Sequence, residues 1–169
     1  MTLPDPINHQ NFLLTLDTSK LPVVKDVIPG LDIWPLFLDP ENGTWVVRVL
    51  FKPGVTLPQH FHTGTVHFYT LSGCWYYLEY PDQKQTAGSY LYEPGGSVHT
   101  LHTPEDNTED TDSFIIVNGA NVNFDEEGNY VSVMDAGWIE MAVVEAAKAQ
   151  GLGMPRYIKP GASAGYSDD

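Results

Sequence analysis

Cysteine is almost missing from this chain of 169 residues. Its one cysteine, Cys74, cannot form a disulfide within the chain, and cysteine-based zinc sites need more thiolates than this. Any bound metal must therefore be held by histidine or carboxylate side chains.

Positive charge is also scarce. The chain has 8 Lys and Arg residues against 22 Asp and Glu residues, which gives a formal charge of -14 at pH 7. This excess repels phosphate backbones and anionic lipid, so we expect neither nucleic acid nor a membrane surface as a partner. Hydrophobic residues at 42% still provide enough apolar surface for one packed domain.

Long apolar runs are absent as well. A membrane-spanning helix needs about 20 consecutive apolar residues, and no run in this sequence reaches that length. The first residues, 1–9, lack the basic flank and the apolar stretch of a signal peptide. From these two absences we expect a cytoplasmic protein.

Short apolar runs separated by turn residues predict an all-β domain. The runs are rich in Val, Ile, Phe, Tyr and Trp, and Gly, Pro, Asn and Asp interrupt them at the spacing of a β-sandwich or β-barrel. The predicted strands are 31–38, 44–52, 59–63, 66–72, 74–80, 89–92, 97–103, 113–117 and 130–134.

Four segments follow from these patterns. Residues 1–30 are predicted to form an N-terminal arm with one short strand or turn, and residues 31–135 a single β-barrel. Residues 136–150 place apolar side chains on one helical face and predict a C-terminal helix. Residues 151–169 predict an extended tail.

The first of two histidine-rich windows covers residues 54–73. His60 and His62 are two residues apart, so on a strand both imidazoles point to the same side. His67 follows a turn at residues 63–65 that can fold it back beside the pair. This window therefore predicts a metal clamp, because histidine is the commonest ligand for zinc, iron and copper.

The second window covers residues 88–102. His99 and His102 are three residues apart, so they point to opposite faces of a strand and at most one can join an interior site. We select His99, because it directly follows the turn at residues 94–96. We expect His102 and His9 to be ordinary polar residues.

Both windows resemble the two signature motifs of the cupin superfamily. The residues that match the first motif, G-x5-H-x-H-x3 or 4-E-x6-G, are Gly54, His60 and His62. Those that match the second, G-x5-P-x-G-x2-H-x3-N, are Gly88, Pro94, Gly96 and His99, with Thr103 in place of the final Asn. The resemblance covers residues 44–118 and implies a small conical β-barrel with a metal inside.

The first window departs from the motif where the family supplies a glutamate ligand. The two allowed spacings place Val66 or His67 there, so the carboxylate is missing. This pattern resembles the branch that contains 2,4'-dihydroxyacetophenone dioxygenase and, more distantly, the acetylacetone-cleaving dioxygenase. Those enzymes hold Fe(II) with three histidines, which implies His60, His62 and His99 as the ligands.

The resemblance implies cleavage of a carbon–carbon bond with O2. Neutral imidazoles leave a divalent ion its full charge, which favours an enolate. The expected substrate is therefore an enolisable ketone, either an aryl α-hydroxy ketone or a 1,3-diketone, with carboxylic acids as products. His67 is either a fourth ligand or the catalytic group that takes the substrate proton.

Other side chains are weaker candidates for the site. Aromatic residues that could line a substrate pocket, or belong to an ordinary core, are Tyr69, Trp75, Tyr77 and Phe114. Arg48 interrupts an apolar run and either emerges at a sheet edge or faces the cavity, where it would hold an anion. We expect Glu93, beside Pro94, at the rim.

Two other functions compete with the dioxygenase. The first is another cupin enzyme, an isomerase or hydrolase that uses Zn(II), Mn(II) or Ni(II). The second is a zinc-binding cupin sensor without catalytic activity. The resemblance and the long flanking segments also lead us to expect a homodimer.

Overall fold

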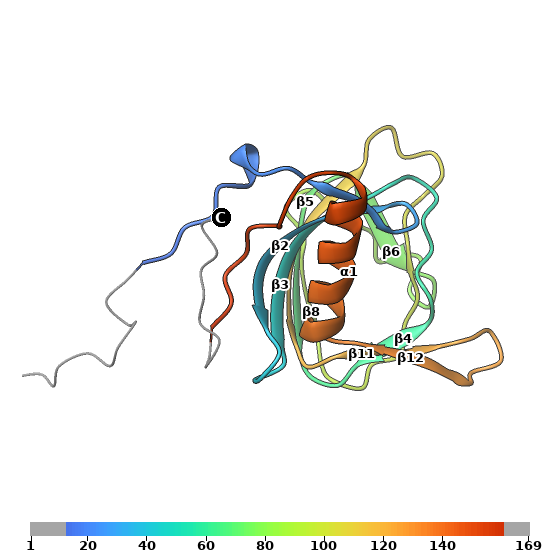
Figure 1. Ribbon diagram of the computed structural model, residues 1–169. Coiled ribbons are helices and arrows are strands. Elements are labelled where there is room, and N and C mark those ends of the chain that lie inside the picture. The colour runs from blue at the N-terminus through green and yellow to red at the C-terminus, as the bar shows by residue number, and fades with distance from the viewer. Residues whose placement is uncertain (1–12, 161–169) are drawn as a thin grey trace, which may run out of the picture.

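Two walls of antiparallel strands enclose the interior of the protein (Figure 1). The computed structural model describes residues 13–160. Its strands are β1 (Val24–Ile28), β2 (Leu31–Asp39), β3 (Thr44–Phe51), β4 (His60–His62), β5 (Val66–Ser72), β6 (Cys74–Tyr77), β7 (Gln85–Thr86), β8 (Tyr90–Glu93), β9 (Leu101–His102), β10 (Thr111–Asn118), β11 (Asn121–Phe124) and β12 (Tyr130–Met134). A short 3-10 helix, η1 (Thr18–Lys20), precedes them and one helix, α1 (Ala136–Ala149), follows.

One wall is a six-stranded sheet in the order β1-β2-β3-β10-β5-β8. The facing wall consists of two three-stranded sheets, β12-β11-β4 and β7-β6-β9. This arrangement confirms the predicted mostly β barrel in a single domain with one C-terminal helix.

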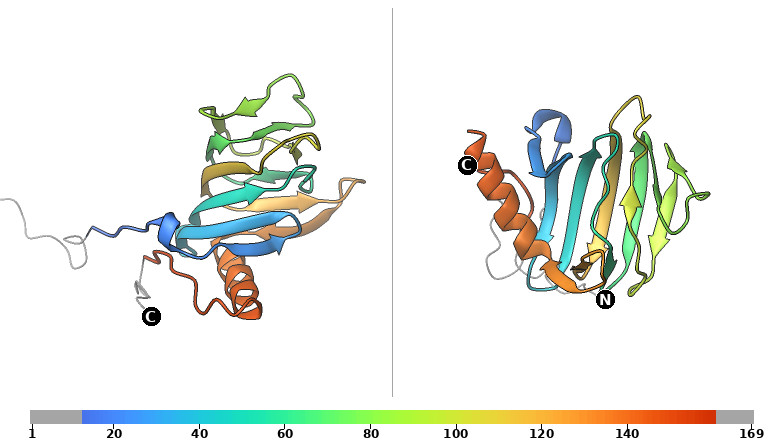
Figure 2. Two further views of the ribbon diagram at one scale, coloured as in Figure 1. Left: turned by 90° about the horizontal axis from the view of Figure 1, so that it is seen from above. Right: turned by 90° about the vertical axis from the view of Figure 1, so that its right-hand side faces the viewer.

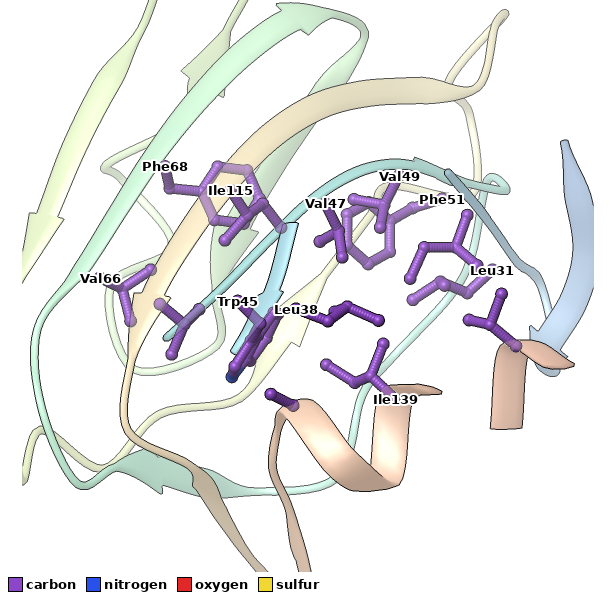
Figure 3. Close-up of a cluster of buried hydrophobic side chains, with 14 of the residues drawn as sticks. Leu31, Leu38, Trp45, Val47, Val49, Phe51, Val66, Phe68, Ile115 and Ile139 are labelled. Carbon is purple, nitrogen blue, oxygen red and sulfur yellow. The ribbon is translucent and has the colours of Figure 1, made fainter. Parts of the chain in front are cut away.

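Strict alternation along β3 shows how the sequence forms this wall. Trp45, Val47, Val49 and Phe51 are buried, whereas the residues between them are partly exposed. Because side chains alternate between the two faces of a strand, the apolar set points into the barrel. Figure 3 shows several of these side chains meeting Leu31 and Ile139 in the core.

Helix α1 covers the barrel beside β1 and β2 (Figure 2). It begins after Asp135, whose side chain accepts a hydrogen bond from the Trp138 backbone N–H at 2.8 Å. Ile139, Val143 and Ala147 are buried on one face, as the predicted helix requires. No described helix is long and apolar enough to span a membrane.

Both flanking segments contact the barrel. Strand β1 is the one short strand within the predicted arm, and it pairs with β2. In the tail, the Ile158 N–H donates to the Leu36 carbonyl at 2.9 Å, and the Tyr157 hydroxyl donates to Glu140 at 2.5 Å. Residues 157 and 158 of the tail therefore pack on their own chain. His9 and the ends of the predicted arm and tail lie outside the described residues.

Candidate metal centre

Three histidines from the two windows meet inside the barrel. His60 and His62 lie on β4, and His99 lies in the segment between β8 and β9. The backbones of His60 and His99 exchange two hydrogen bonds, with N···O distances of 3.0 and 2.9 Å. The structure thus brings together the three residues that the sequence selects as ligands.

The geometry of these three side chains suits a metal ion. One ring nitrogen from each lies within 4.8 Å of the others, and all three side chains are buried. The ring centroid of His60 lies 5.1 Å from that of His62 and 4.7 Å from that of His99. The three imidazoles therefore face one common point, where a divalent ion could bind.

The orientation of His60 is fixed by its own strand. Its Nδ1 lies 2.7 Å from the carbonyl oxygen of Pro58, which can only accept a hydrogen bond. Nδ1 therefore carries the proton and Nε2 is left with a free lone pair. This is the tautomer that a metal requires, and a backbone carbonyl is a typical partner for the second nitrogen of a ligating histidine.

Burial keeps the imidazoles neutral. Together with the neighbouring His60 and His99, it lowers the pKa of His62 to about 3. Burial and His60 likewise lower the pKa of His99 to about 4. At neutral pH both rings are unprotonated and available to a metal ion.

A buried carboxylate accompanies the histidines. Glu93 Oε2 lies 3.3 Å from Nε2 of His62 and 3.3 Å from Nε2 of His99, and the Tyr77 hydroxyl donates to the other oxygen. Burial raises the pKa of Glu93 to about 7, although the bond from Tyr77 opposes this shift. The expected position at the rim is wrong, because Glu93 is only 4% exposed.

The sequence misses Glu93 because the motif directs attention to the positions after His62. Its signal is weak but present. Leu91 and Glu93 are two residues apart on β8, so they share the face that points inward. A carboxylate from β8 thus stands at the site whose first motif lacks one.

His67 does not join the cluster. It lies on β5 between Val66 and Phe68, which are buried, so its side chain points to the outer face of the sheet. There its Nδ1 is hydrogen-bonded to the Tyr90 hydroxyl at 2.8 Å. The expectation that His67 folds back beside the pair as a ligand or proton acceptor is therefore wrong.

Arg48 also lies outside the barrel. Its guanidinium forms two hydrogen bonds to Asp112, at 3.0 and 2.6 Å, and donates to the Thr18 hydroxyl at 2.7 Å. Strand β3 is central in its sheet, so Arg48 does not emerge at an edge. It alternates with the buried Val47 and Val49, so it does not face the cavity either. Both expectations for Arg48 are corrected: it pairs with a carboxylate on the outer face.

The four aromatic candidates divide between two faces. Tyr77 lines the cavity, and its ring stacks on His99 at 4.2 Å between centroids. Trp75 is fully buried against Phe68 and belongs to the core. Tyr69 and Phe114 are register partners with alternation opposite to the buried residues, so they point outward.

The cavity in front of the histidines has a volume of about 80 Å³. Its polar lining residues are His60, His62, Glu93, Tyr77 and Asn121, and the remaining walls are aliphatic or aromatic. Among the described residues, no Lys or Arg lines it. The site therefore favours an uncharged, largely apolar molecule.

Unpaired atoms support a metal at this point. Nε2 of His99 and Oε2 of Glu93 are buried and have no hydrogen-bond partner among the described residues. Unpaired buried polar atoms are costly, and a cation would satisfy both. The donor set of three imidazoles suits Fe(II), Zn(II) or Mn(II).

The fold is shared with proteins of known structure. The chain is 53% identical to a protein of unknown function with a cupin-like fold from Ralstonia eutropha JMP134, over 94% of this chain and 99% of that chain, with a TM-score of 0.86. An acetylacetone dioxygenase from Acinetobacter johnsonii is 14% identical over 86% of this chain and 99% of its own, with a TM-score of 0.68. At that identity the likeness shows the fold alone.

A putative acetylacetone dioxygenase from Methylibium petroleiphilum PM1 gives a similar result, with 15% identity over 84% of this chain and 99% of its own, and a TM-score of 0.69. No curated protein matches the sequence. Residues 13–119 match the family model described as the ChrR cupin-like domain. Because this match covers more than half of the chain, the protein belongs to the ChrR cupin-like family.

Proposed function

We propose that this protein is a metal-dependent dioxygenase that cleaves a carbon–carbon bond of an enolisable ketone with O2. The observation that carries the proposal is the convergence of three neutral imidazoles with one buried carboxylate at an apolar cavity. The shared fold with an acetylacetone dioxygenase supports it.

His60, His62 and His99 would hold the metal, for which Fe(II) is our choice. When bound, this ion supplies Lewis-acid and one-electron chemistry that zinc cannot fully replace. The choice of Fe(II) rests on the resemblance of the histidine motif to dioxygenases that use Fe(II), since the ligand set alone also fits zinc or manganese.

Glu93 is placed to receive the proton that an enolisable ketone loses. Its Oε2 faces the same space as the imidazole nitrogens, 3.3 Å from two of them, so a carbonyl compound held there lies within reach. The Tyr77 hydroxyl holds the other oxygen and fixes the direction of the carboxylate. Glu93 thus takes the role that the sequence assigns to His67.

The cavity walls contribute by excluding water and charge. Apolar side chains surround the site, and no basic side chain of the described chain is available to bind a carboxylate or phosphate group on the substrate. In such a low-dielectric environment the electrostatic interactions around a developing enolate are strengthened. The proposal therefore covers uncharged 1,3-diketones and aryl α-hydroxy ketones.

Metal analysis followed by an oxygen-electrode assay tests the proposal. Protein purified without chelator and loaded anaerobically with Fe(II) should bind about one ion per chain and consume O2 when 2,4-pentanedione or 2,4'-dihydroxyacetophenone is added. His60→Ala should abolish both. His102→Ala is the matched control, since His102 is bound to Thr56 outside the cluster and should leave both unchanged.

Two results would contradict the dioxygenase. Isomerase or hydrolase turnover with Zn(II), Mn(II) or Ni(II) would indicate a different cupin enzyme. Tight zinc binding with no O2 uptake after iron loading would indicate a binding protein without catalysis. The expected homodimer is a separate proposal, which the mass of the native protein in solution tests.

A further inference from the structure

The barrel wall has a seam between β1 and β12. Strand β1 is an edge of the six-stranded sheet and β12 is an edge of the sheet β12-β11-β4, and no strand pairing among the described residues joins them. Helix α1 packs against β1, β2 and β12 and thus borders this seam (Figures 1 and 2). Side-chain packing, rather than a hydrogen-bonded ladder, therefore closes the barrel here.

The cavity reaches the surface at this seam. Most of its lining residues are buried, and those that are partly exposed are Val27, Ile28, Leu57, Met134 and Trp138. We call these five residues the apolar ring. Val27 and Ile28 belong to β1, Met134 ends β12 and Trp138 lies in the first turn of α1, so the ring surrounds the seam.

Leu57 lies on the facing wall, where its backbone N–H donates to the Leu101 carbonyl at 3.0 Å. It follows Val55, whose side chain lies against Gly30 in the turn between β1 and β2. By contrast, lining residues far from the seam are buried, such as Val66 and Phe68, which are at most 4% exposed. Four of the five most exposed lining residues therefore border the seam.

An irregular strand places two consecutive residues in the ring. Neighbouring residues of a regular strand point to opposite faces, yet both Val27 and Ile28 line the cavity. The register of β1 against β2 shifts between Val24 and Ile28, and Asp26 has a φ of 48°. This left-handed residue forms a bulge that turns both side chains inward.

A row of paired residues leads from the ring to the histidines. Met134 pairs with Asn121 across β12 and β11, and Asn121 pairs with His62 across β11 and β4. Two strand spacings, about 10 Å, therefore separate the backbone of Met134 from that of His62. A small organic molecule at the ring lies within one molecular length of the candidate metal centre.

On these grounds, and resting on the proposed function, we infer that the ketone reaches the metal centre through the seam and that the apolar ring selects substrates by the width of their apolar substituents. Trp138 and Met134 have the largest side chains of the ring, so they act as specificity-determining residues. The ring carries no charge, which disfavours passage of ionised molecules.

Two variants widen the opening and one narrows it. Trp138→Ala and Met134→Ala should raise kcat/KM for 1,3-diphenyl-1,3-propanedione relative to 2,4-pentanedione by about tenfold or more, because size discrimination in apolar pockets has this magnitude per group removed. Val27→Phe should change the ratio in the opposite direction. Met141→Ala is the matched control, since Met141 lies on the same helix and is 52% exposed.

A second measurement tests the route without turnover. The neutral chelator 1,10-phenanthroline should extract Fe(II) from the loaded protein faster in Trp138→Ala and Met134→Ala, slower in Val27→Phe, and at the parent rate in Met141→Ala. Circular dichroism checks that each variant is folded. If the parent turns over no ketone, the proposed function fails while the extraction rates still test the route.

The inference is wrong if both widening variants match Met141→Ala in extraction rate and in substrate ratio. It is also wrong if Val27→Phe leaves both quantities unchanged, because a narrower ring must slow passage. Faster extraction with an unchanged substrate ratio would overturn the selection of substrates by the ring.

Discussion

Histidines on the inner and outer faces of the same barrel differ sharply in their surroundings. Inside, His62 and His99 are buried, and their neighbours are other imidazoles and one carboxylate. Outside, His67 is hydrogen-bonded to Tyr90, and His102 to Thr56. The inner rings have unsatisfied nitrogens that a cation can use, whereas the outer rings have ordinary partners. The face of the strand, rather than the residue type, determines which histidine can bind a metal.

The largest difference between the two faces should appear in metal binding. His62→Ala removes one of three converging imidazoles, and two rarely hold a labile divalent ion, so bound metal should fall to background. His67→Ala should retain about one ion per chain, because His67 points away from the site. Elemental analysis of both proteins measures this, and normal metal content in His62→Ala would remove the basis for the site.

The stability of the metal-free protein should depend on pH because ionisable side chains are buried on the inner face. The pKa values of His62 and His99 are lowered to about 3 and 4, so the unfolded chain binds more protons than the folded one below pH 6.5. Stability is then lost as the pH falls towards those values. Glu93, with its pKa raised to about 7, acts in the opposite direction between pH 4.5 and 7.

The two imidazoles outweigh the single carboxyl group between pH 6.5 and 4.5. We expect a net loss of free energy of unfolding on the order of 2 kcal/mol over this range. Thermal unfolding of metal-free protein at several pH values measures the loss. His62→Leu should flatten the curve, and a curve as steep as that of the parent would show that the inner histidines do not cause it.

A smaller effect is expected when the Tyr77 hydroxyl, which is hydrogen-bonded to Glu93, is removed. Tyr77→Phe removes the hydrogen bond to Glu93, which should lower kcat/KM by about tenfold. Because that bond lowers the pKa of Glu93, its loss should also move the acidic limb of the pH–rate profile to higher pH. Tyr69→Phe, on the outer face, should change neither, and equal effects of the two variants would contradict this role of Tyr77.

The smallest effect concerns the outer ion pair. Arg48→Ala removes both hydrogen bonds to Asp112, which is only 8% exposed, and should lower stability by about 1 to 2 kcal/mol. Metal content and substrate ratio should stay at parent values. A loss of turnover in the folded variant would show that Arg48 acts on the site after all.

The strands were predictable wherever alternation and turn residues coincide. The predicted strand 66–72 agrees with β5, and the strand 130–134 agrees with β12. Strands β7 and β11 were missed, and β1 was expected only as one short strand or turn somewhere in residues 1–30. β7 is only two residues long, and β1 contains the bulge at Asp26, which disturbs alternation. Short or irregular strands depend on their partners more than on their own residues.

Strand alternation and turn residues also made part of the candidate site predictable. The two-residue spacing of His60 and His62 shows directly that both side chains point to the same face of a strand. The turn before His99 is the reason for selecting it rather than His102. His67 and Arg48 were misplaced because alternation shows which residues share a face but not which face is inner. His67 alternates with Val66 and Phe68, and that pattern becomes decisive only when the barrel interior is known.

The paired backbones of His60 and His99 have a consequence for the order in which the barrel folds and the metal ion binds. These residues are distant in the sequence, yet their reciprocal hydrogen bonds hold two of the three imidazoles on one rigid frame. The conformational entropy of bringing the two windows together is thus lost when the barrel folds and not when an ion arrives. Such a site is preorganised: it should bind its ion with little rearrangement, and it cannot exist in a chain whose barrel has not closed.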